Sequence, residues 1–191
     1  CRRDSIDRDV HDLLNTASLV STELKDGLNG YFASLGPDSP IQSLSDLVAD
    51  GGIIFNKFER YKAVLANAPG YDSPEYKKDL AKRSTLRAEL ERLMEAQNLD
   101  GLVYLHNLYP AQYINAPVKY TKVKLSSVSG LPGICVPAGF TSLNQPVGIE
   151  FLTRAFDEDD LFSIAAGYEQ ATLHRMLPAT TPALPGETFT Y

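Results

Sequence analysis

The stretch Ser126–Pro178 constrains the fold more than any other part of the chain. Glycine and proline residues at positions 130–133 break the chain, and the apolar run Ile134–Val136 then predicts a short strand buried on both faces. Pro137 is expected to end that strand. After a polar loop, the β-branched and aromatic run Val147–Leu152 predicts a second strand.

An amphipathic helix is predicted to follow these two strands. Four acidic residues at positions 157–160 load its first turn, where the positive end of the helix dipole favours them. His174 and Arg175 lie near the negative end, and Pro178 marks the stop. The apolar stripe that should face the sheet recurs at helical spacing and comprises Leu161, Ile164, Ala165, Tyr168 and Thr172.

The first part of the chain has helical patterns. Apolar residues three or four positions apart predict one long helix over residues 7–35, which a Gly-Pro pair ends. Ser43 to Asp46 opens a short helix in the manner of a capping box, with Asp in place of Glu or Gln. A further helix is expected over Ile53–Ala66.

Residues 73–121 predict a helix, a strand and a long loop. Ser73 is a suitable helix cap because Pro74 follows it at the first helical position, and the apolar stripe continues to Gln97. Leu102–Leu105 is a short apolar run typical of a strand. The polar and aromatic segment His106–Thr121 then predicts a loop of a length that is often functional.

We therefore expect one domain fragment with three parts: a mainly helical segment over residues 1–99, a strand-strand-helix part of a sheet over residues 100–178, and a C-terminal tail over residues 179–191. Of the 191 residues, 43% are hydrophobic and 22% are charged, which is typical of a globular chain. A helix and a strand, followed later by a strand-strand-helix pattern, predict an α/β fold with helices covering a mixed sheet.

Charge and hydropathy exclude several kinds of partner. The formal net charge is −6, from 18 basic and 24 acidic residues, so no basic surface is predicted for nucleic acid. No apolar run approaches the roughly 20 residues that a membrane span needs, which predicts a soluble protein, either cytoplasmic or secreted. The two cysteines, Cys1 and Cys135, cannot form a disulfide framework, and Cys135 is expected to be buried in its strand.

Several runs occur in an order that is specific to a known family. GLPGICVPAGF at 130–140, PVGIEFLTRAFDEDDLFSIA at 146–165 and YEQATLHR at 168–175 resemble the closing segment of amidase signature enzymes. That family includes peptide amidases, fatty acid amide hydrolases and the amidase subunit of tRNA-dependent amidotransferases. ELKDGLNGYF at 23–32 resembles the segment before this region in peptide amidases, and LDGLVYLHN at 99–107 resembles the strand that enters the substrate cleft.

The resemblance implies a fold, a reaction and a substrate wall. The fold would be the C-terminal part of a mixed β-sheet covered by helices, in the amidase signature arrangement. The reaction would be hydrolysis of the carbon-nitrogen bond of a small carboxylic amide through a Ser acyl-enzyme, with no metal and no cofactor. Tyr104, His106, Asn107 and Ser129 would lie nearest the substrate. Alternatively, His106 only caps a strand end and Ser129 only forms a turn beside Gly130.

The catalytic residues that the family uses are not recognisable in this chain. Amidase signature enzymes use two Ser residues in a Gly- and Ser-rich stretch and a Lys base, all of which precede the region matched here. The pair Ser126-Ser127 lacks flanking glycines, although Lys122 and Lys124 stand nearby. We therefore assign no catalytic residue and expect a C-terminal portion whose partner is the N-terminal catalytic half, in the same or a second polypeptide. Alone, the chain should be inactive.

Other interpretations remain open at this level. The chain could be a non-catalytic relative that binds a ligand or partner through an apolar sheet face bearing Ile134, Val136, Ile149 and Phe151. An N-terminal Cys1 could serve as a nucleophile with its own amine as base. Glu150 with the acids at 157–160 could be imagined as a cation site, but the helix dipole explains those acids more simply. No zinc or nucleotide motif is present, so no metal site is expected.

Overall fold

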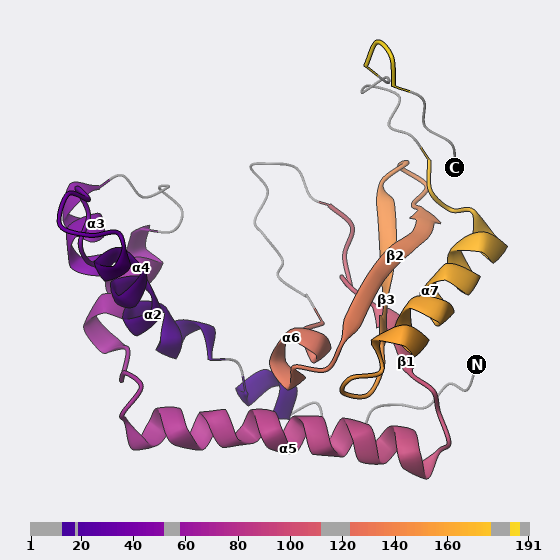
Figure 1. Cartoon of the computed structure of the whole chain (residues 1–191), viewed down its shortest axis with the longest axis horizontal. Coiled ribbons are helices and arrows are strands. Elements are labelled where there is room, and N and C mark those ends of the chain that lie inside the picture. The colour runs from indigo at the N-terminus through magenta and orange to yellow at the C-terminus, as the bar shows by residue number, and fades with distance from the viewer. Residues whose placement is uncertain (1–12, 18, 52–57, 112–122, 177–183, 188–191) are drawn as a thin grey trace. The chain divides into compact units, whose positions relative to one another are not determined.

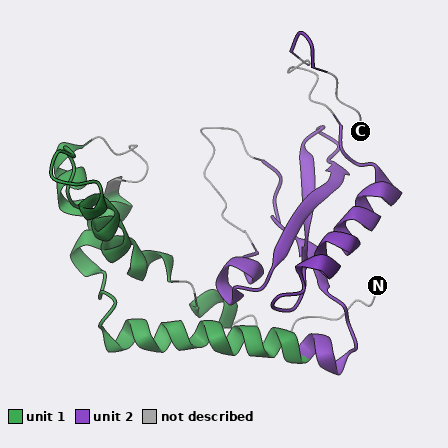
Figure 2. Ribbon diagram, viewed as in Figure 1, with its two compact units in different colours: residues 1–92 green, residues 93–191 purple. Residues whose placement is uncertain are grey.

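The computed structural model describes residues 13–17, 19–51, 58–111, 123–176 and 184–187 (Figure 1). The chain divides into two compact units, residues 1–92 and residues 93–191, which Figure 2 shows in different colours. The division falls within α5, which spans Pro74–Ala96.

The first unit contains α2 (Val20–Ser34), α3 (Leu44–Asp50), α4 (Phe58–Asn67) and most of α5. The expectation of one continuous helix over residues 7–35 is wrong. Residues 13–16 are helical, but Ala17 and Leu19 are not, and α2 begins at Val20. Ala17 and Leu19 are 0% and 3% exposed, so the break itself carries buried apolar side chains. An apolar period does not separate one long helix from two shorter ones in the same stretch.

The helix starts predicted at Ser43 and Ser73 are confirmed. Ser43 Oγ accepts a hydrogen bond from the backbone N–H of Asp46 at 3.1 Å, and Asp46 Oδ2 accepts one from the N–H of Gln42 at 3.1 Å. Both bonds satisfy backbone donors at the N-terminus of α3, although the Asp46 carboxylate bonds to Gln42, one residue before the cap residue Ser43. Ser73 Oγ likewise accepts from the N–H of Tyr76 at 3.0 Å at the start of α5.

Polar contacts hold parts of the first unit together. The N–H of Leu44 donates to Asn29 Oδ1 at 2.8 Å, which ties the start of α3 to α2. The phenol of Tyr76 donates to Glu23 Oε1 at 3.0 Å, which ties α5 to α2. Leu44 and Val64 contribute buried apolar side chains to this unit. Of the helix expected over Ile53–Ala66, the structure describes the part from Phe58 onward as α4.

The second unit is built on a three-stranded antiparallel sheet. β1 (Leu102–Leu105), β2 (Gly133–Phe140) and β3 (Pro146–Leu152) lie in the order β1-β3-β2. Helix α7 (Glu158–Thr172) lies along this sheet (Figure 1). The ring of Tyr168 contacts the ring of Phe151 of β3 edge-on, with 5.5 Å between the ring centroids. The predicted α7 stripe is confirmed, since Leu161 and Ala165 are buried.

The two faces of this sheet differ in chemistry. The register aligns Tyr104, Glu150 and Cys135 in one row across the three strands, and Val103, Phe151 and Ile134 in the next. Successive residues of a strand point to opposite faces, so these rows lie on opposite faces. The contact with Tyr168 places α7 over the apolar face. On that face Val136 is buried, while Ile134, Ile149 and Phe151 are half-buried.

Two expectations for β2 are wrong. Pro137 does not end the strand, which continues to Phe140 through an irregularity between Pro137 and Gly139. Proline is tolerated there because β2 is an edge strand of the described sheet. Cys135 is exposed and not buried, since Val136 on the opposite side of the strand takes the packed position at 8% exposure. No helix among the described residues combines the length and apolar character needed to cross a membrane.

Candidate functional site

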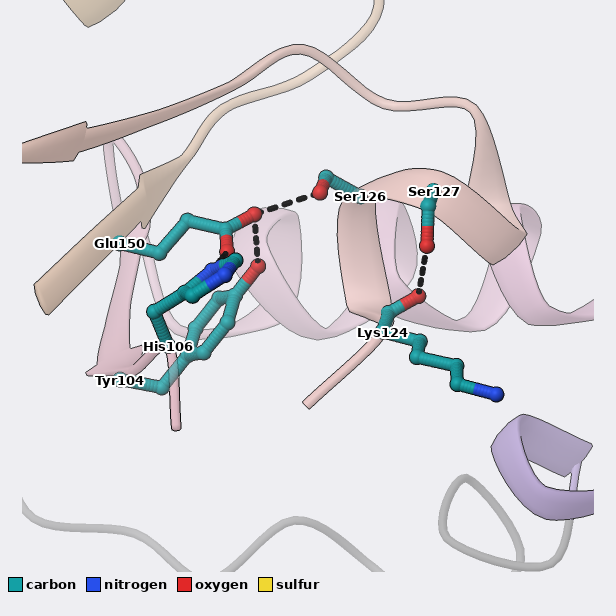
Figure 3. Close-up of polar contacts among 6 residues, drawn as sticks. All are labelled: Tyr104, His106, Lys124, Ser126, Ser127 and Glu150. Carbon is teal, nitrogen blue, oxygen red and sulfur yellow. Dashed lines mark hydrogen bonds and ion pairs between the residues drawn. The ribbon is translucent and has the colours of Figure 1, made fainter. Parts of the chain in front are cut away.

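A buried carboxylate on β3 gathers three polar side chains (Figure 3). Glu150 is only 4% exposed. Its Oε1 accepts hydrogen bonds from the Tyr104 hydroxyl at 2.7 Å and from Ser126 Oγ at 2.5 Å. Its Oε2 lies 2.6 Å from Nδ1 of His106. Three elements that are distant in sequence therefore meet at one side chain.

Strand register and one glycine explain why these side chains meet. Tyr104 is the direct cross-strand partner of Glu150, and His106 lies two positions further along, on the same side of the chain. Ser126 belongs to α6 (Leu125–Ser129). A Cβ atom at Gly133 would lie 2.8 Å from Ser126 Cβ and 2.9 Å from Glu150 Oε1. Glycine at position 133 therefore allows α6 to approach the carboxylate.

The hydrogen bonds decide the charge of the site. Burial alone raises the pKa of Glu150, but hydrogen bonds from Ser126, His106 and Tyr104 outweigh it, so the pKa is lowered overall. The pKa of Tyr104 is raised, first by burial and then by its hydrogen bond to Glu150. At neutral pH Glu150 is therefore a carboxylate and Tyr104 a neutral phenol. A carboxylate only accepts hydrogen bonds, so its three partners are the donors.

Cys135 lies on the same face of the sheet, beside Glu150. The two residues are direct cross-strand partners, and a Cβ atom at Gly148 would lie 2.8 Å from Cys135 Sγ, so the thiol occupies the space over that glycine. Partial burial of the thiol and then the charge of Glu150 raise the pKa of Cys135. Reactive cysteines have a lowered pKa, so Cys135 is not activated as a nucleophile.

The structure brings together two of the four residues that the sequence suggested. Tyr104 and His106 both contact Glu150 directly. Asn107 follows His106 in the chain and is exposed, but no contact joins it to the carboxylate in the described part of the structure. The loop expected over His106–Thr121 is described only as far as Ala111.

Ser129 lies in a different environment. It is 4% exposed, and its hydroxyl donates to the carbonyl oxygen of Leu125 at 2.6 Å. The same hydroxyl accepts from the N–H of Leu131 at 3.2 Å. These bonds connect α6 to the segment that leads into β2. The hydroxyl of Ser129 therefore serves the local backbone and not the carboxylate.

Sequence reasoning misses the residue at the centre of the site. It considers Glu150 only as part of a cation site, and Ser126 only as half of a serine pair. The available signal is the acid itself within the apolar run Val147–Leu152, because a carboxylate in a buried strand requires hydrogen-bond partners. Within the described residues, no group of three or more His, Cys, Asp or Glu side chains is placed to hold a metal ion.

The serine and lysine residues near α6 do not form an activated pair in Figure 3. Ser127 Oγ donates to the backbone carbonyl oxygen of Lys124 at 3.3 Å, and the side chain of Lys124 extends away from Ser126 and Glu150. Lys122 and Cys1 lie outside the described residues.

Comparison with known proteins identifies relatives among amidases. The chain is 35% identical over 166 residues to a protein of Arabidopsis thaliana named probable amidase, covering 82% of this chain and 29% of that protein. It is 34% identical over 114 residues to a glutamyl-tRNA(Gln) amidotransferase subunit of Staphylococcus carnosus, covering 56% of this chain and 23% of that protein. No protein-family model matches the chain.

Solved structures agree with the sequence matches. Native peptide amidase from Stenotrophomonas maltophilia superposes with a TM-score of 0.68 at 27% identity, over 88% of this chain and 35% of that protein. An amidase family protein from Bacillus anthracis gives a TM-score of 0.68 at 26% identity, over 86% of this chain and 31% of that protein. The chain thus spans 35% or less of each of these relatives. It is a homologue of the amidase signature enzymes and shares their fold over most of its length.

Proposed function

We propose that this chain forms part of an enzyme that hydrolyses small carboxylic amides through a Ser acyl-enzyme, releasing ammonia or an amine. The observation that carries this proposal is the 35% identity to a protein named probable amidase over 82% of the chain. The similarity to peptide amidase at a TM-score of 0.68 supports it from the fold.

In this proposal the acyl-enzyme chemistry belongs to an N-terminal catalytic half, in the same or a second polypeptide. Two features of this chain support that division. The hydroxyl of Ser126 donates to Glu150, whose lowered pKa makes the carboxylate a weak base for activating a serine. The amine of Lys124 points away from this hydroxyl.

The contribution of this chain would be a wall of the substrate site. Tyr104 and His106 are the proposed substrate contacts, because a buried carboxylate fixes both side chains. Asn107 is a third proposed substrate contact, because it follows His106 in the chain and is exposed. Ser129 stays a prediction, because its buried hydroxyl is bonded within its own backbone segment.

The test begins with native mass spectrometry of the purified protein beside a denaturing run of the same sample. We expect this chain to occur together with the catalytic half, and we expect the assembly to react with a fluorophosphonate on a serine and to release ammonia from benzamide. The isolated 191-residue chain is the matched control and should do neither. An assembly that neither reacts with the fluorophosphonate nor cleaves an amide would overturn the proposal.

A further inference from the structure

His106 is held on one side of its ring and open on the other. Nδ1 lies 2.6 Å from Oε2 of Glu150. The side chain of Glu150 is 6% exposed, whereas that of His106 is 39% exposed. Nδ1 faces the buried carboxylate, and the side chain as a whole is partly exposed. Nε2 has no hydrogen-bond partner among the residues that the structure describes.

The partners of Glu150 decide which ring nitrogen carries the proton. Oε1 already accepts from the hydroxyls of Tyr104 and Ser126, and among the described residues the hydrogen-bond partner of Oε2 is His106. A carboxylate offers no proton, so Nδ1 must be the donor in this contact. In a neutral imidazole with the proton on Nδ1, Nε2 has a free lone pair and is an acceptor.

We propose that Glu150 is a positioning residue that orients His106 so that Nε2 accepts a hydrogen bond from an amide N–H of a ligand bound on this face of the sheet. The choice of an amide rests on the proposed function, whereas the orientation of the ring rests only on the contacts of Glu150. A primary or secondary carboxamide offers the N–H that Nε2 requires. A tertiary amide offers none.

The variant Glu150→Gln makes the proposal testable, because it keeps the side-chain shape and replaces one oxygen by an NH₂ group. Two hydroxyls donate to the Oε1 position and one ring nitrogen to the Oε2 position, so the amide oxygen should remain at Oε1. The NH₂ group then faces Nδ1 of His106. Nδ1 must accept, and the proton moves to Nε2.

The measurement is a long-range ¹H–¹⁵N NMR spectrum of the histidine rings at a pH high enough to observe the neutral imidazole. The signals of His106 are identified by their loss in His106→Gln. We expect the tautomer with the proton on Nδ1 in the wild type and the opposite tautomer in Glu150→Gln. Tyr104→Phe keeps the carboxylate and is the matched control, in which the tautomer should not change.

A wild-type ring with its proton on Nε2 would overturn the proposal, and so would an unchanged tautomer in a folded Glu150→Gln variant. If that variant does not fold, the wild-type spectrum alone still tests the proposal, because it shows which ring nitrogen of His106 carries the proton. A purely structural role of Glu150 predicts loss of stability, but it does not predict a reversed tautomer.

The ligand is tested by titrating the wild-type protein with benzamide and, separately, with N,N-dimethylbenzamide. We expect the Nε2 signal to shift with benzamide only, because only that probe has an N–H donor. Equal shifts with both probes, or none with either, would overturn the ligand assignment. A protein that shows the benzamide shift but hydrolyses no amide would contradict the proposed function and leave this inference standing. Hydrolysis of an amide without the benzamide shift would contradict this inference and leave the proposed function standing.

Discussion

Nδ1 of His106 lies 2.6 Å from Oε2 of Glu150, although 44 positions separate the two residues in the chain. The contact joins the residue that follows β1 to β3 on the polar face of the sheet. Hydroxyls from Tyr104 and Ser126 donate to the same carboxylate. The stability of this part of the second unit should therefore depend strongly on Glu150.

Replacing Glu150 by Ala should lower the free energy of unfolding by about 3 kcal/mol, because three donors lose a buried charged acceptor. Urea denaturation followed by circular dichroism measures the change. Glu169→Ala is the control, since Glu169 is exposed on α7 and its removal should change stability by less than about 0.5 kcal/mol. Equal stabilities of the two variants would show that the network around Glu150 contributes little.

The contribution of Glu150 should depend on pH in a defined direction. The pKa of Glu150 is lowered in the folded chain relative to the ordinary value of 4.5, so the unfolded chain takes up this proton first as pH falls. The stabilisation is therefore present above pH 4.5 and is lost as pH falls through the lower folded pKa. The difference in unfolding free energy between the wild type and Glu150→Gln should be larger at about pH 7 than at about pH 3. A difference that grows towards acid would contradict the assigned charge.

Two glycine substitutions should have opposite effects. Gly133→Ala places a Cβ atom 2.8 Å from Ser126 Cβ and 2.9 Å from Glu150 Oε1, which should cost about 1 to 3 kcal/mol as α6 is displaced. At Gly167, within α7, a Cβ atom would meet nothing within 4 Å. Gly167→Ala should therefore stabilise the chain by about 0.5 to 1 kcal/mol through helix propensity. Thermal denaturation of both variants measures the contrast, and similar effects of the two would contradict the close approach at Gly133.

Cys135 should report on the charge of Glu150. Because that charge contributes to the raised pKa of the thiol, Glu150→Gln should lower the pKa and increase the thiolate fraction. We expect iodoacetamide to modify Cys135 faster in Glu150→Gln than in the parent at the same pH, with Cys1→Ser in both proteins to leave one thiol. An unchanged rate in the folded variant would mean that the carboxylate does not influence this thiol.

Local features of the fold were predictable from the sequence. The starts of α3 and α5 depend on Ser43 and Ser73, whose side chains bond to the backbone three residues away. The strand at Val147–Leu152 and the buried stripe of α7 follow from the spacing of apolar residues within one element. In each case the residues that determine the structure are neighbours in the chain.

Features that depend on distant residues were not predictable. Cys135 is exposed because α7 covers the opposite face of the sheet, where Val136 is buried, and the apolar run does not reveal which face is covered. The break at Ala17 and Leu19 interrupts a periodic pattern that is equally typical of one helix. The site around Glu150 requires the register between β1 and β3, which no local pattern specifies.

The most direct test of the account is the KM for benzamide hydrolysis by the protein that contains this chain, compared between the wild type and His106→Gln. His174→Gln is the matched control, because His174 follows α7 and lies near Tyr168, away from Glu150. Loss of one hydrogen bond to the substrate should raise KM about tenfold in His106→Gln, which corresponds to about 1.4 kcal/mol, with KM unchanged in His174→Gln. Hydrolysis with the same KM in all three proteins, or no hydrolysis by the wild type, would contradict the account.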